Sequence, residues 1–269
     1  MFFSIICVSF NAEDLIRATL NTVLEQTFSD CEIIVKDGMS KDKTLDEIPL
    51  DKRIKVYSSK DGGIYNAMNE AVTYASGKYL LFLNCGDKLV NSNVLQTVYD
   101  QIIEDKNEDN LCIYYGNYLR KDVETVQPVA ISKFSLYRSP LNHQSMFFSH
   151  RVFSEISFYD DTMKVCADYY LTVKAYNCGV KFKHVDCLID FYQGQGFSES
   201  KKNKKISKME RRKILKDNFT LFERFKYGSL MFLTLRPLRI AIASDEAPAW
   251  LRKGYKKIVN KVNGAKSKD

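Results

Sequence analysis

The stretch "KYLLFLNCGDKL", residues 78–89, decides the fold class of this sequence. Tyr79 to Leu83 form an unbroken apolar run, which is typical of a central strand covered on both faces of a parallel sheet. Polar residues follow abruptly, and the run of them includes Asp87. The carboxyl ends of parallel strands border the ligand crevice of an open α/β sheet. The stretch therefore indicates a buried strand that delivers a carboxylate to a site.

Strands and helices alternate on both sides of this strand, as in an α/β domain with a largely parallel sheet. Asn11 is a candidate N-cap for the first helix, and Gly77 and Gly179 are candidate helix stops. The expected strands are 4–10, 32–37, 53–59, 78–84, 111–119 and 180–191, and the expected later helices are 62–77 and 167–179.

Length and composition fit one sizeable domain, since the chain has 269 residues of which 45% are hydrophobic. The apolar start, "MFFSIICVSF", has no basic residues before it and ends at Asn11, so it is expected to be a core strand and not a targeting segment. The seven cysteines include no C-x-x-C pair. This favours free thiols in a reducing cytoplasm and argues against a zinc site.

Charge divides the chain into two parts. Residues 1–199 hold 20 Lys and Arg against 27 Asp and Glu, whereas residues 200–269 hold 20 against 6. The tail is therefore net +14 and the body net −7. We predict a catalytic α/β domain over 1–199 and a basic, partly amphipathic helical tail over 200–269.

Three acidic residues, Asp37, Asp61 and Asp87, each follow a different expected strand. Because the carboxyl ends of these strands share one edge of the sheet, the three side chains are expected to converge. Each also has a structural alternative. Asp37 could form an Asx-turn, Asp61 could cap the next helix, and Asp87 could be a surface residue of a Gly-Asp turn.

In order along the chain, several motifs resemble the family 2 glycosyltransferases of the GT-A fold. The resemblance covers roughly residues 3–200 and depends on the combination of motifs. The opening unit ends in "KDGMSKDKT", the donor-site helix and its strand are "KDGGIYNAMNEAVTYASGKYLLFLNCGD", and the acceptor-side elements are "NHQSMFF", "CADYYLTVKAY" and "FYQGQGFS". The resemblance implies a mixed, largely parallel central sheet with flanking helices.

The metal motif departs from the common family pattern. The family often has Asp-x-Asp there, and a subset has the Asn-x-Gly-Asp form that this chain shows at Asn84 to Asp87. The resemblance makes Asp87 the ligand of Mn²⁺ or Mg²⁺. Such ions are held by one or two carboxylates together with substrate phosphates, so one acid is sufficient.

The resemblance also assigns the donor nucleotide and the catalytic base. It places Ser9, Asn11, Asp37 and Asp61 at the nucleotide, with Asp37 able to accept a hydrogen bond from the uracil imide. Asp168 becomes the general base that activates the acceptor hydroxyl and leads to inversion. Asp168 is equally typical of a first-turn acid that complements the helix dipole.

On the acceptor side the resemblance points to His143, Gln144 and Ser198. A lone His beside an apolar run is more often a packing residue, so both interpretations of His143 stay open. His184 falls on the apolar side of an alternating strand and is expected to pack, not to bind metal.

The end of the tail, "WLRKGYKKIVNKV", predicts an amphipathic helix with cations around an apolar face. An anionic membrane surface is the expected partner. A solvated helix is the first alternative, and nucleic acid is disfavoured. The apolar run before Arg236 is far short of the roughly 20 residues that span a bilayer.

Together these features predict an inverting, metal-dependent glycosyltransferase that moves a hexosyl or N-acetylhexosaminyl group from a UDP-sugar. The acceptor is expected to be a lipid-linked glycan of O-antigen or capsule type, at the inner face of the cytoplasmic membrane. Two alternatives remain: a nucleotidyltransferase that makes nucleotide sugars, and a catalytically silent GT-A relative. The first would have a Gly-rich loop after strand one, where this chain has "NAEDLIRATL".

Overall fold

The structure, a computed structural model, describes residues 1–106, 111–120, 123–192, 200–233, 248–250 and 252–254. Within them the strands are β1 Phe3–Ser9, β2 Cys31–Asp37, β3 Ile54–Ser58, β4 Tyr79–Phe82, β5 Lys88–Leu89, β6 Cys112–Arg120, β7 Val123–Thr125, β8 Met146–Ser149 and β9 Lys181–Tyr192. The helices are α1 Ile16–Leu24, α2 Ile64–Tyr74, α3 Val94–Glu104, α4 Lys133–Arg138, α5 Ala167–Asn177, α6 Lys201–Asn218 and α7 Leu221–Leu233, with single turns η1 His143–Ser145 and η2 Val152–Ile156.

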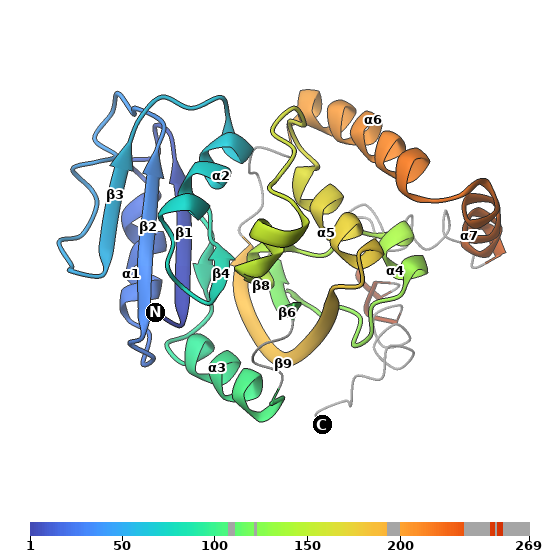
Figure 1. Cartoon of the computed structure of the whole chain (residues 1–269), viewed down its shortest axis with the longest axis horizontal. Helices are drawn as coiled ribbons and strands as arrows, with labels where there is room; N and C mark the ends of the chain where they lie inside the picture. Colours follow the sequence, from blue (N-terminus) through green and yellow to red (C-terminus); the bar gives the residue numbers. More distant parts are fainter. Residues whose placement is uncertain (107–110, 121–122, 193–199, 234–247, 251, 255–269) are drawn as a thin grey trace.

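The described strands form one mixed sheet in the order β3-β2-β1-β4-β8-β6-β9-β5, with β7 paired to β6. Strands β3, β2, β1 and β4 are parallel, β8 is antiparallel to both of its neighbours, and β9 runs parallel to β6. Figure 1 shows β3 at one end of the molecule and α6 and α7 at the other. The predicted central position of β4 is confirmed, since all four of its residues are buried.

Helices cover both faces of the sheet because β1, β2 and β4 bury side chains in both directions. One core cluster joins α2, α5 and α6 to one face, and a second joins α1 and α3 to the other. Ile6 and Leu80 belong to the first cluster, and their strand neighbours Ile5 and Leu81 belong to the second. This alternation explains why the apolar runs of β1 and β4 are continuous.

Two local predictions are wrong. Asn11 does not cap α1, which begins at Ile16 with Leu15 as N-cap; Asn11 has φ 49° and its side chain accepts a hydrogen bond from the Lys41 amide at 2.9 Å. Gly77 does not stop α2, which ends at Tyr74 with an extended Ala75. Gly77 is needed for close approach, because a Cβ there would collide with Ser4. Gly179 does follow the end of α5, with φ 82°.

Glu32 joins three strands and the α2–β4 turn at the edge of the sheet away from the carboxyl ends of the strands. Its buried carboxylate accepts hydrogen bonds from the hydroxyl of Ser4 at 2.6 Å and the amide of Ser76 at 2.6 Å, and it pairs with Lys55 at 2.6 Å. Burial alone would raise the pKa of Glu32, but these partners lower it to about 2.

We expect Glu32→Gln to lower the free energy of unfolding by about 2 kcal/mol at pH 7, because it removes charge-assisted hydrogen bonds. The native pKa lies below the ordinary value of 4.5, so the carboxylate stabilises the fold above that pH. This contribution disappears as the pH falls toward 2. Urea unfolding of both proteins between pH 7 and 3 measures the difference. Glu25→Gln, at an exposed position, is the control and should change little.

Candidate active site

Two neighbouring residues of η1 contact the two acids that the sequence singled out. The Nδ1 atom of His143 lies 3.2 Å from Oδ2 of Asp168, and Nε2 of Gln144 donates to Oδ2 of Asp87 at 2.9 Å. Asp87 follows β4, whereas Asp168 lies in the first turn of α5. A single turn therefore joins the expected metal acid to the expected base.

Asp168 is surrounded by hydrogen-bond donors and has a side chain that is 18% exposed. Besides His143, the hydroxyl of Tyr65 donates to its Oδ1 at 3.0 Å. Burial alone would raise the pKa of Asp168, but the hydrogen bond and charge of His143, with the Tyr169 amide and Tyr65, hold it below its ordinary value. Asp168 is therefore ionised at neutral pH and accepts hydrogen bonds from its neighbours.

Asp87 lies in a more apolar environment. Burial raises its pKa to about 6, against the opposing effects of Gln144 and His143. A second carboxylate, Asp190 of β9, is fully buried, and its pKa is raised well above the ordinary value by burial and by the charge of Asp87. The amide of Asn142 donates to both oxygens of Asp190, at 3.1 and 3.2 Å.

Asn84 completes this region. Its Nδ2 lies 3.3 Å from Nε2 of His143, and its Oδ1 is buried without a hydrogen-bond partner among the described residues. Within those residues no group of three or more His, Cys, Asp or Glu side chains is placed to hold a metal ion. The unpartnered oxygen of Asn84 and the carboxylate of Asp87 nevertheless suit Mg²⁺ or Mn²⁺, which prefer oxygen ligands and complete their shell with phosphates and water.

Ser9 and Asp37 lie together at the carboxyl ends of β1 and β2. Asp37 is fully buried and accepts hydrogen bonds from the hydroxyls of Ser9 at 3.2 Å, Ser40 at 2.5 Å and Ser58 at 2.9 Å. The Ser40 amide also donates to it at 2.9 Å, which is the Asx-turn alternative. Burial alone would raise the pKa of Asp37, but these donors lower it. To accept a hydrogen bond from the imide of a uracil base, Asp37 must first lose the hydrogen bond from one of these three Ser hydroxyls.

Asp61 lies beside this turn. A Cβ added at Gly38 would meet Asp61 Oδ2 at 2.8 Å, and the buried ammonium of Lys36 is 3.6 Å from the same oxygen. The other oxygen of Asp61 accepts from the amide of Gly63, the N-cap of α2, at 3.0 Å. Asn11, which is exposed, donates from its amide to the Ser40 hydroxyl at 2.9 Å. The four predicted nucleotide residues thus border one region.

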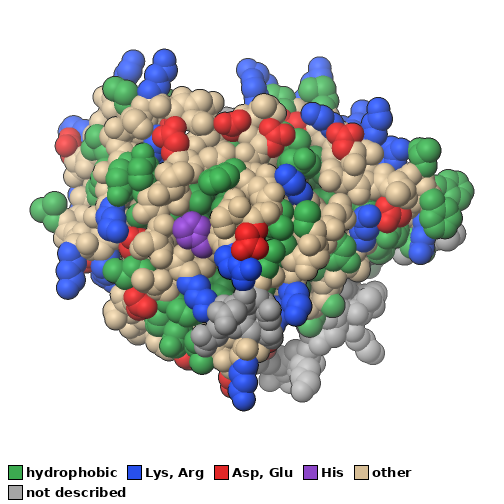
Figure 2. All heavy atoms as spheres, in the orientation of Figure 1, with side chains coloured by type: hydrophobic (Ala, Val, Ile, Leu, Met, Phe, Trp, Pro, Cys, Tyr) green, Lys and Arg blue, Asp and Glu red, His purple; other side chains and the backbone are tan. Residues whose placement is uncertain are grey.

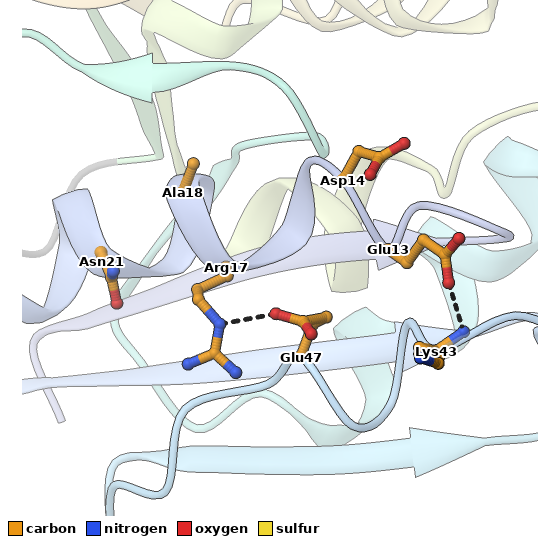
Figure 3. Close-up of a pocket in the computed structure, with 7 residues that line it drawn as sticks. All are labelled: Glu13, Asp14, Arg17, Ala18, Asn21, Lys43 and Glu47. Atoms are coloured by element: carbon orange, nitrogen blue, oxygen red, sulfur yellow. Dashed lines mark hydrogen bonds and ion pairs between the residues drawn. The ribbon is translucent and has the colours of Figure 1, made fainter.

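Two further residues were considered from the sequence, one as a site residue and one as a packing residue. Ser198 lies outside the described residues. His184 packs as expected, 3.2 Å from Asn117 Oδ1 and edge-on to Tyr115. Figure 3 shows a separate surface cavity of about 580 Å³ beside α1, crossed by the ion pair of Arg17 and Glu47 at 2.7 Å. None of the predicted site residues lines it.

Comparison with known proteins decides the family. The model described as "Glycosyl transferase family 2" matches residues 4–160, more than half of the chain. The chain belongs to glycosyl transferase family 2. This match does not favour the nucleotidyltransferase alternative.

Among the relatives of this glycosyltransferase is a "PGL/p-HBAD biosynthesis glycosyltransferase" of Mycobacterium bovis. It is 29% identical over 181 residues, which cover 65% of this chain and 70% of the relative. The Escherichia coli protein WfgD, named a "UDP-Glc:alpha-D-GlcNAc-diphosphoundecaprenol beta-1,3-glucosyltransferase", is 35% identical over 118 residues, 43% of this chain and 45% of WfgD.

The solved structures include S. aureus TarS 1-349, with a TM-score of 0.58 at 21% identity over 72% of this chain and 60% of TarS 1-349. The same protein in complex with UDP-GlcNAc matches with a TM-score of 0.61 at 19% identity, over 80% of this chain and 67% of that one. At these identities the likeness concerns the fold, and it confirms the predicted GT-A architecture.

Sequence reasoning about this glycosyltransferase missed Tyr65, Asn84 and Asp190 as site residues. Asp190 had a usable signal, since it interrupts the apolar segment "CLIDFY" of β9. Asn84 was part of the metal motif, but its unpartnered oxygen depends on packing. Tyr65 had no signal in the sequence, because it contacts Asp168, which is 103 positions away.

We expect Tyr65→Phe to raise the pKa of Asp168, because the substitution removes a hydrogen bond to the ionised carboxylate. NMR titration of the Asp168 carboxyl carbon measures the shift. Tyr159→Phe is the matched control, since the Tyr159 hydroxyl is buried nearby without a partner among the described residues. Equal shifts in both variants would contradict the role given to the Tyr65 hydroxyl.

Proposed function

We propose that this enzyme transfers a hexosyl or N-acetylhexosaminyl group from a UDP-sugar, with inversion and with help from Mn²⁺ or Mg²⁺, to a lipid-linked glycan in cell-surface polysaccharide synthesis. The observation that carries the proposal is the pair of contacts from η1: His143 to Asp168 at 3.2 Å and Gln144 to Asp87 at 2.9 Å. Adjacent residues thereby contact both the candidate base and the candidate metal acid, which supports metal-assisted sugar transfer from a nucleotide donor.

Asp168 acts as the general base in this proposal. Its lowered pKa keeps it ionised, so it can take the proton of the acceptor hydroxyl as that oxygen attacks the anomeric carbon. The hydrogen on Nδ1 of His143 points to one carboxylate oxygen and the Tyr65 hydroxyl to the other. These donors orient the carboxylate. Attack on the side opposite the departing nucleotide then inverts the anomeric centre.

Asp87 and Asn84 would hold the divalent cation, which stabilises negative charge on the departing diphosphate as a Lewis acid. Burial of Asp87 beside Asp190 disfavours two negative charges there, and a bound cation offsets that repulsion. Gln144 orients Asp87 by donating to one of its oxygens, which leaves the other for a ligand.

Support for the substrates comes from relatives. WfgD is named for UDP-glucose and for a diphosphoundecaprenol-linked acceptor, and TarS has been solved with UDP-GlcNAc. In this chain Ser9, Asn11, Asp37 and Asp61 would surround the uridine, and His143 and Gln144 would face the acceptor. Ser198 remains a candidate on the acceptor side.

A membrane-facing surface would suit a lipid-linked acceptor. On α7 the side chains of Leu221, Phe222, Phe225 and Phe232 are 73 to 78% exposed. Figure 2 shows the resulting hydrophobic cluster at the end of the molecule where Figure 1 places α7, with Lys and Arg side chains nearby. Aromatic side chains flanked by cations suit the headgroup layer of anionic lipid. No described helix is both long enough and apolar enough to span a bilayer.

Substitution of the two acids should separate metal-assisted binding from base catalysis. We expect Asp87→Asn to abolish turnover and the enhancement of UDP binding by Mn²⁺. Asp168→Asn should abolish turnover, at least a hundredfold loss for a general base, and leave UDP affinity nearly unchanged. Calorimetric titration with UDP, with Mn²⁺ or with EDTA, measures binding, and release of UDP from UDP-glucose or UDP-GlcNAc measures turnover. An equal loss of UDP affinity in both variants would contradict this division.

Removal of the exposed aromatic side chains should weaken membrane binding. We expect the double variant Phe222→Ser, Phe225→Ser to sediment at least tenfold less with phosphatidylglycerol vesicles, because each Phe contributes about 1.5–3 kcal/mol when buried. Leu50→Ser, at an exposed position before β3, is the control.

A second prediction concerns residues 247–269, most of which lie outside the described part: their deletion should also reduce sedimentation and leave UDP binding intact.

A further inference from the structure

The carboxylate of Glu210 on α6 accepts hydrogen bonds from three consecutive backbone amides just before α5. The amide of Lys164 donates to Oε1 at 2.7 Å, and those of Val165 and Cys166 donate to Oε2 at 3.0 and 2.9 Å. Cys166 is the N-cap of α5, and its own side chain makes no capping hydrogen bond. Lys164 and Val165 precede the helix, whereas the Cys166 amide at the N-cap is one that the helix itself leaves without a partner. Glu210 supplies the acceptor from 44 residues farther along the chain.

Val165 is held on two sides. Its amide donates to Glu210, and its carbonyl accepts from the Tyr65 hydroxyl at 2.7 Å. The one hydrogen of this hydroxyl is shared with Oδ1 of Asp168, at 3.0 Å. Through Val165 and the cap, Glu210 therefore sets the position of the α5 start that carries Asp168.

The next residue of α6, Arg211, holds the segment that leads to His143. Its guanidinium donates to the carbonyls of Tyr137 at 3.0 Å and Arg138 at 2.7 Å, at the end of α4. The same group lies over the ring of Tyr169, 5.4 Å from its centroid. Glu210 therefore bonds to the segment just before Asp168, and Arg211 bonds to the segment that leads to His143.

We propose that Glu210 and Arg211 are positioning residues, which hold Asp168 and His143 at hydrogen-bond distance, so that α6 is part of the catalytic machinery. The inference rests on the proposed function only where it concerns turnover. The geometric part concerns the His143–Asp168 contact of 3.2 Å and is independent of any substrate.

The first test is the NMR signal of the proton on Nδ1 of His143 in ¹⁵N-labelled protein. A protected downfield resonance is expected in the native protein and in Glu223→Ala. It should be lost or exchange-broadened in Glu210→Ala and partly restored in Glu210→Gln, which keeps one acceptor oxygen. Glu223 is the matched control, because it caps α7 through the Thr220 amide at 2.9 Å and pairs with Lys133 at 2.9 Å. An unchanged resonance in Glu210→Ala, in a protein with native circular dichroism, would overturn the proposal.

The second test compares turnover with nucleotide affinity, using UDP-glucose or UDP-GlcNAc with Mn²⁺. Glu210→Ala should lower kcat at least tenfold with KM for the donor unchanged, and Glu223→Ala should match the native protein. A parallel loss of UDP affinity in Glu210→Ala would indicate a general structural role and overturn the positioning role. If Asp168→Asn retains turnover while the His143 resonance depends on Glu210, the proposed base fails and the positioning inference stands.

Discussion

The contact between His143 and Asp168 depends on the one reversal of strand direction in the middle of the sheet. Strand β8 enters antiparallel between β4 and β6, and η1 lies immediately before it. Because β8 is antiparallel to β4, its beginning lies beside the carboxyl end of β4. The residues of η1, which come just before β8, therefore lie near Asp87, which follows β4. If the neighbouring strand were parallel, its carboxyl end, and not the η1 turn before it, would lie beside the carboxyl end of β4. The mixed topology therefore lets one short segment contact an acid from β4 and an acid from α5.

Burial raises the pKa of both acids that contact η1, but their hydrogen-bond donors give them opposite net shifts. Burial raises the pKa of Asp87 to about 6, because its one side-chain donor, Gln144, and the charge of His143 oppose burial only in part. Asp168 has two side-chain donors and a backbone amide, so its pKa falls. A bound cation would favour the ionised form of Asp87, whereas Asp168 is already ionised and free to accept a proton from an acceptor hydroxyl. Both residues are Asp, so the different hydrogen-bond donors around each carboxylate separate the two proposed roles.

The sequence predicted the elements whose periodicity is strong and missed those that depend on long-range contacts. Strands β1, β2, β4 and β6 were predicted from their apolar runs, and β9 from its alternating pattern. Strand β8 was hidden in "NHQSMFF", and its short length carries little pattern. Asp87 and Asp168 were identified through motif order, and their roles stay predictions. Tyr65 and Glu210 could not be found, because their partners lie far away in the sequence.

Helix α6 shows why charge alone describes a segment incompletely. Its composition is basic, so the sequence suggested a tail distinct from the body, and in the structure most of its Lys side chains are exposed. The buried side contains few residues: Ile214 and the following Phe219 join the core of α2 and α5, and Glu210 is one of two acids on the helix. The boundary at 199/200 stays a prediction from composition. A helix can present cations to its surroundings and still place one carboxylate where the start of α5 needs an acceptor.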